Sequence, residues 1–198
     1  ASVADAAEAV AKGASTGIAK STLAETALAQ VIENVSAGAT AGLGTGDKLN
    51  STDFANAMEK IAKAAAQSIG ASGIKDSTLA GAIAAASSGA TKGLALSGAD
   101  SDTITASSAR IAKGASQGMA ESGLTTTQIV SLTEKVAQGA IAGLSGLGLS
   151  VANLSIAVEG ASKGAVSGIS GTVMTSDELA TTLKGISTGA MAGLSKIK

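Results

Sequence analysis

Apolar residues recur along this chain at a spacing that is typical of helices. A six-residue phrase, Gly-Ala, two variable residues, Gly and then Ile, Leu or Met, begins at positions 13, 38, 89, 114, 139, 164 and 189, with a worn copy at 64. The period is 25 residues with one insertion, so eight copies fill the 198 residues. In every copy further apolar residues stand ten and three positions before the phrase, on one face of a 3.6-residue helix. Each repeat is therefore predicted to be one amphipathic helix.

Alternate repeats differ in a way that pairs them. The odd copies carry a lysine just before the phrase, at Lys12, Lys63, Lys113 and Lys163, and the even copies do not. A helix of about 18 residues is about 27 Å long, and turns of roughly six residues reach at most about 20 Å. Neighbouring helices are therefore expected to be antiparallel. The sequence predicts one all-α repeat domain over 1–198, a solenoid or bundle of four αα-hairpins at about 1–49, 50–99, 100–149 and 150–198.

The glycines of the phrase require an explanation, because a glycine inside a helix costs about 1 kcal/mol relative to alanine. Spaced four residues apart, they lie on one side of a helix and allow another backbone to approach closely. Helix ends, where glycine is common, are the alternative. The close-packing hypothesis predicts a helix-packing seam at Gly13, Gly17, Gly38, Gly42, Gly89, Gly93, Gly114, Gly118, Gly139, Gly143, Gly164, Gly168, Gly189 and Gly193.

Polar residues indicate how the predicted helices begin and which face meets water. Three threonines followed three residues later by Glu or Gln predict capping boxes (Thr22 with Glu25, Thr125 with Gln128, Thr175 with Glu178). Three odd helices place Glu four residues before Lys, a favourable order on a solvated helix face (Glu8–Lys12, Glu59–Lys63, Glu159–Lys163).

Composition then removes several classes of function. The chain has a net charge of −1 and contains no His, Cys, Trp or Tyr, so we expect no nucleic-acid binding, no thiolate or imidazole metal site and no cofactor. Asp100 and Asp102 could ligate calcium, but a helix cap explains them better. Residues 136–158 carry no charge and are long enough to cross a bilayer. They include a turn at a repeat boundary, so a membrane span is not expected.

Repetition without a distinctive chemical constellation favours a non-catalytic role over an enzyme. We expect a structural protein that assembles with itself, as a filament or a surface layer. Residues 1–4, Ala-Ser-Val-Ala, are typical of the residues that follow a signal cleavage site, which predicts secretion. The alternative is an ice-binding protein. For either partner the candidate surface is the small-residue face of the even helices, at Thr40, Ala41, Thr91, Ala142, Thr181, Thr188 and Ala192.

Overall fold

The chain folds into helices, as its periodicity predicts. A computed structural model describes residues 3–44 and 49–197, and this part of the chain forms eight α-helices and no strand. They are α1 (Val3–Ala19), α2 (Glu25–Ala41), α3 (Ser51–Gly70), α4 (Asp76–Leu96), α5 (Ser101–Ala120), α6 (Thr126–Ala142), α7 (Val151–Gly168) and α8 (Ser176–Leu194). One helix falls in each 25-residue repeat, so the prediction of an all-α repeat array is confirmed.

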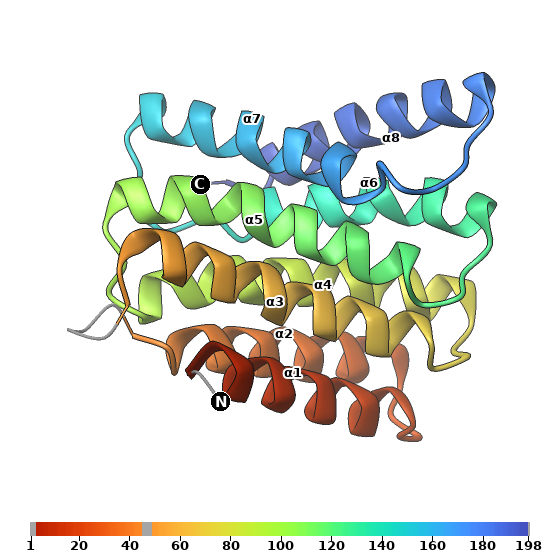
Figure 1. Ribbon diagram of the computed structural model, residues 1–198, viewed down its shortest axis with the longest axis horizontal. Coiled ribbons are helices and arrows are strands. Elements are labelled where there is room, and N and C mark those ends of the chain that lie inside the picture. The colour runs from red at the N-terminus through yellow and green to blue at the C-terminus, as the bar shows by residue number, and fades with distance from the viewer. Residues whose placement is uncertain (1–2, 45–48, 198) are drawn as a thin grey trace.

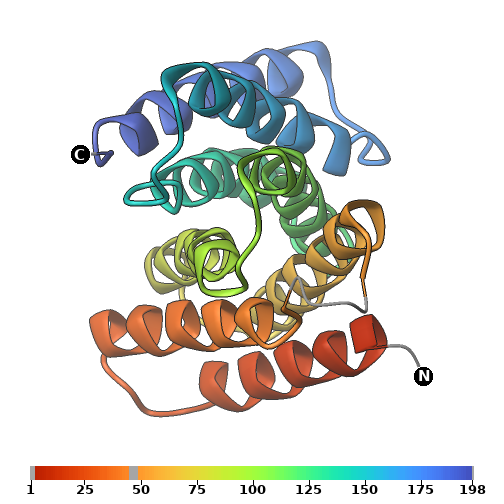
Figure 2. The ribbon, with the colours of Figure 1, turned by 90° about the vertical axis from the view of Figure 1, so that its left-hand side faces the viewer.

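The helices run up and down in stacked hairpins. Figure 1 shows the chain reversing direction after each helix, with the turn inside each hairpin at one end and the loop to the next hairpin at the other. Odd-numbered helices pack on one another in one layer, and even-numbered helices form a second layer. Contacts within a layer are more extensive than those between the two helices of any hairpin. In Figure 2 the stack rises from α1 and α2 at the bottom to α7 and α8 at the top.

Local signals at the helix ends explain where most helices start and turn. Both capping boxes predicted for α6 and α8 are present (Thr125 with Gln128, Thr175 with Glu178). The box predicted at Thr22 is wrong, because α2 begins only at Glu25 and its N-cap, Ala24, has no side chain that can cap it. Gly73 and Gly123 occupy matching places in the turns after α3 and α5, with φ values of +74° and +84°, which glycine adopts without strain.

The core between the two layers is thin. Ile61, Ile111 and Phe54, the one aromatic residue, are fully or almost fully buried, and alanines fill much of the remaining interior. Buried hydroxyls such as those of Ser87 and Thr133 donate hydrogen bonds to the carbonyl four residues earlier in their own helix. This arrangement satisfies a buried hydroxyl without a partner on another helix. Helices with such small side chains must lie close together to keep their atoms in contact.

Candidate functional site: the stacking faces

The glycines of the phrase bring helices of the same layer into backbone contact. A methyl group added at the first glycine would overlap the carbonyl oxygen of a residue two helices earlier (Gly89 on Glu33, Gly114 on Glu59, Gly139 on Ala84, Gly164 on Ala109, Gly189 on Glu134). At the second glycine the fit is nearly as close: a methyl group on Gly143 would lie 2.6 Å from the carbonyl oxygen of Ser88. The same crowding is found at Gly93, Gly118, Gly168 and Gly193. The seam therefore joins successive hairpins within a layer.

The glycines of the first hairpin have no such neighbour. A methyl group on Gly13, Gly17 or Gly38 would meet nothing within 4 Å, and one on Gly42 would meet only carbonyls of its own helix. The reason is positional, because no described helix lies on that side of α1 and α2 (Figure 2). We call the open side of these two helices, which carries these four glycines, the glycine face.

Replacing Gly139 with alanine tests whether the seam excludes side chains. The added methyl group would overlap the Ala84 carbonyl oxygen and force α4 and α6 apart, so we expect a loss of about 1–3 kcal/mol in the free energy of unfolding. Gly81→Ala is the matched control, because Gly81 also lies inside a helix but has open space around it. It should gain up to about 1 kcal/mol from helix propensity. Urea denaturation measures both, and equal stabilisation of the two variants would contradict the close seam.

The opposite side of the stack exposes apolar side chains. Leu179, Leu183 and Met191 of α8 are 45%, 45% and 71% exposed. The residues at the same repeat positions of the two inner even helices are buried (Leu79, Ile83 and Thr91 in α4; Ile129, Thr133 and Ile141 in α6). The difference arises because α4 and α6 are each covered by the next even helix, whereas no described helix covers α8. On this side of each inner helix, backbone carbonyls lie against the glycines of the next helix of the same layer. We therefore call the open side of α7 and α8 the carbonyl face.

Ion pairs link neighbouring odd helices, where the sequence predicted Glu–Lys pairs within single helices. Glu59 receives Lys113 at 2.7 Å and Arg110 at 2.8 Å, both from α5, and not Lys63 of its own helix. Lys63 pairs instead with Glu121 at 2.9 Å. Of the three predicted pairs, the described residues show only Glu159–Lys163. The prediction was wrong for Glu59 and Lys63 of α3, because the neighbouring helix α5 offers cations that sequence spacing within one helix does not reveal.

The environment of Glu59 shifts its acidity. Burial alone would raise the pKa of Glu59, but hydrogen bonds from Lys113 and Arg110 outweigh it and hold the pKa below its ordinary value. A carboxyl group with a lowered pKa in the folded state stabilises the fold above its unfolded pKa, and that stabilisation is lost as the pH falls through the folded value.

We therefore expect Glu59→Gln to lower the free energy of unfolding by about 1 kcal/mol at neutral pH. The difference from the unaltered chain should shrink below about pH 4.3, where the unfolded carboxyl becomes protonated, and vanish below the folded pKa. Urea denaturation at pH 7 and pH 3 measures both differences. Glu159→Gln, which removes only an exposed pair within one helix, should have a smaller effect. An equal loss at both pH values would show that the pairing with α5 is not its cause.

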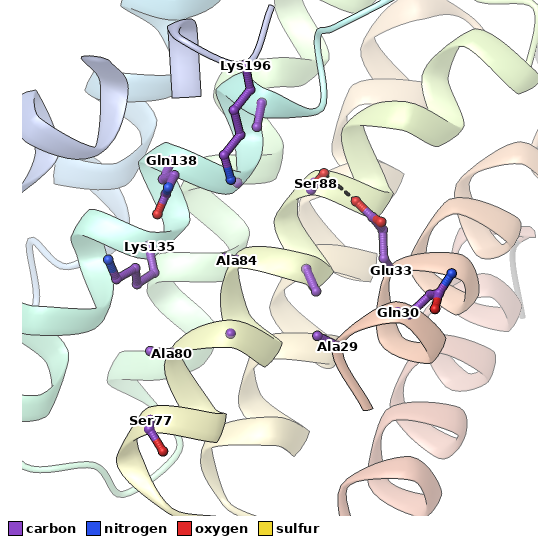
Figure 3. Close-up of a pocket in the computed structure, with 14 residues that line it drawn as sticks. Ala29, Gln30, Glu33, Ser77, Ala80, Ala84, Ser88, Lys135, Gln138 and Lys196 are labelled. Carbon is purple, nitrogen blue, oxygen red and sulfur yellow. Dashed lines mark hydrogen bonds between the residues drawn. The ribbon is translucent and has the colours of Figure 1, made fainter. Parts of the chain in front are cut away.

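The outer side of the even layer holds a trough of about 580 Å³. Figure 3 shows its floor on α4, where Ala80, Ala84 and Ser88 present small side chains, with Glu33 of α2 on one wall and Lys135 of α6 on the other. At the corresponding positions α6 carries longer side chains (Val130, Glu134 and Gln138), whereas α2 does so only at Glu33. A comparison of the repeats in the sequence is enough to find this run of small residues in α4.

The polar contact in the trough does not form an activated nucleophile. The Ser88 hydroxyl donates a 2.6 Å hydrogen bond to Glu33, which also accepts one from Lys92 at 2.8 Å. Burial would raise the pKa of Glu33, but these two hydrogen bonds lower it below its ordinary value. A carboxylate with a lowered pKa is a weak base, so the contact does not favour removal of the serine proton.

Part of the predicted candidate surface is in the interior. Thr40 and Thr91 are fully buried, which corrects the expectation that they face a partner or ice. They pack against the second glycine of the next even helix: a methyl group on Gly93 would lie 2.5 Å from the Thr40 Cβ atom. Of the other candidates, the alanines are partly exposed and the threonines exposed (Ala41, Ala142 and Ala192; Thr181 and Thr188). Both exposed threonines belong to α8, so the four candidate threonines do not form one exposed face across the even layer.

Other predicted sites have structural explanations. Asp100 is the N-cap of α5 and accepts a 2.8 Å hydrogen bond from the Thr103 backbone, as a capping residue does. Among the described residues, no three acidic side chains gather where they could hold a metal ion. No helix in the same part of the chain combines the length and the apolar character needed to cross a membrane.

The chain matches no family model, and no similar curated protein is found.

Proposed function

We propose that this protein is a non-catalytic structural protein that assembles with copies of itself. The observation that supports it is the exposure of Leu179, Leu183 and Met191 on the carbonyl face, at positions that the inner even helices bury. A soluble helical array normally ends in helices whose outer sides are polar. Here the two open faces resemble the faces that are covered between successive hairpins inside the stack, with glycines on one and apolar side chains on the other.

Burial of these side chains supplies a driving force for assembly. An apolar side chain that moves from full exposure to full burial stabilises a contact by about 1.5–3 kcal/mol. The three leucine and methionine side chains are partly covered already, so each would contribute less than that. Val158 and Val166 stand at the positions of α7 that are equivalent to Leu183 and Met191, are also only partly buried, and would add to the same contact. Secretion remains a prediction, because no feature of the described residues tests it.

The proposal predicts that the mass of the particle rises with protein concentration. Light scattering or sedimentation from low micromolar to near-millimolar concentration should show species well above the 18.6 kDa of one chain. Because burial of apolar surface drives the contact, added salt should not dissolve the assemblies. Met191→Glu should weaken assembly, whereas Leu96→Glu, at an equally exposed position (71%) away from both open faces, should not. A single-chain mass at every concentration would contradict the proposal.

A further inference from the structure

We infer that two copies join head to tail, with the carbonyl face of one copy on the glycine face of the next. This inference rests on the proposed self-assembly and specifies which surface meets which. The occupant is a second copy of this chain, placed in the register that successive hairpins already use. The internal junctions supply the evidence, because they show what each kind of face accepts.

In the odd layer, the two open faces have the features of a covered junction. The carbonyl oxygens of Ala109 and Lys113 lie against Gly164 and Gly168, where no side chain fits. Glu159 and Lys163 stand at the same repeat positions of α7 as Ala109 and Lys113 do in α5. Their carbonyls would therefore meet the corresponding glycines of the next copy, which are the open Gly13 and Gly17 of its α1.

In the even layer the match extends to a side chain. Thr91 packs against Gly143, with its Cβ atom 2.7 Å from the position of an added methyl group. Ile141 makes the equivalent contact with Gly193, at 2.8 Å. Met191 is the residue at this position of α8, and it is 71% exposed. Head-to-tail stacking would place it on Gly42 of the next copy and cover it.

One charge pair of the internal junctions would also recur. Glu59 of α3 pairs with Lys113 of α5, and their equivalents across the new contact are Glu159 and Lys12 of the second copy. Lys12 has no ion-pair partner among the described residues. The pair between Lys63 and Glu121 would not recur, because Lys20 stands at the Glu121 position in the first hairpin. Charge thus selects the register only weakly, and shape and apolar burial must hold it.

Contacts between like faces lack this complementarity. Two glycine faces would set open glycines against one another, without the backbone carbonyls that fit closely against the glycines at the internal junctions. Two carbonyl faces would set backbone oxygens and Met191 side chains against one another, with no glycine to receive them. A head-to-tail contact is heterologous, so it leaves one free face of each kind and continues into a filament or closes as a ring.

The test uses one variant for each face. Gly38→Gln adds a side chain to the glycine face at a position with open space in the single chain, so the variant should fold normally. Met191→Glu places a charge on the carbonyl face at an exposed position. Gly81→Gln and Leu96→Glu are the matched controls, because they make the same changes on surfaces that belong to neither face. Circular dichroism confirms helix content, and sedimentation velocity measures mass for each variant and for an equimolar mixture.

Each face variant alone should associate about tenfold or more weakly than the unaltered chain, while both controls assemble normally. An equimolar mixture of the two face variants should form particles of two chains and no larger. Each pair can make one contact between an intact glycine face and an intact carbonyl face. Dimers of either variant alone, or a mixture that stays monomeric while the unaltered chain assembles, would overturn the head-to-tail inference and leave self-assembly standing. A monomeric unaltered chain would overturn both.

Discussion

The contact between a glycine of one helix and a backbone carbonyl two helices earlier determines how this array stacks. The interior contains one aromatic residue and many alanines, so its side chains reach only a short distance from each helix axis. Dispersion attraction falls steeply with separation. Helices of this composition gain enough contact only if their backbones come close, and glycine is the residue that permits this. Layers of alternate helices, and not the hairpins, are therefore the main packing units.

This dependence predicts uneven stability along the stack, and the junction of α1 with α3 shows why. There the phrase is worn, with Ala64 and Ser68 in place of the two glycines of α3. α1 packs less extensively on α3 than α3 does on α5, although α4 packs no more extensively on α6, where both glycines are present. With both layers taken together, the first hairpin has the least extensive contact of any two successive hairpins. An exposed ion pair between Lys60 and Asp5, 2.6 Å apart, joins the two helices, but such pairs contribute little in water. In an array where each unit touches only its neighbours, the first hairpin should therefore open most readily.

Much of the fold could be predicted from the sequence, because the information was local. The 25-residue period, the turn lengths and two of three capping boxes each depend on residues close together in the chain. The partners in the seam could not be predicted, since a perfect repeat gives the same pattern whichever neighbour a face meets. Thr40 and Thr91 were misplaced for this reason: a residue inside the phrase faces the next helix of its own layer. Glu59 was misassigned because Lys113 and Arg110 approach it from a different repeat.

The glycine face is the part of the molecule that the fold of a single chain does not explain. In an inner helix, the cost of a glycine is offset by the close contact that it allows. In α1 and α2 the same residues lower helix propensity by about 1 kcal/mol each in the helix interior, and Gly13, Gly17 and Gly38 have no neighbour within 4 Å that would require them. The worn phrase of α3 shows that a helix of this array forms without these glycines. A second helix pair on the glycine face would give them the role that they have everywhere else in the stack.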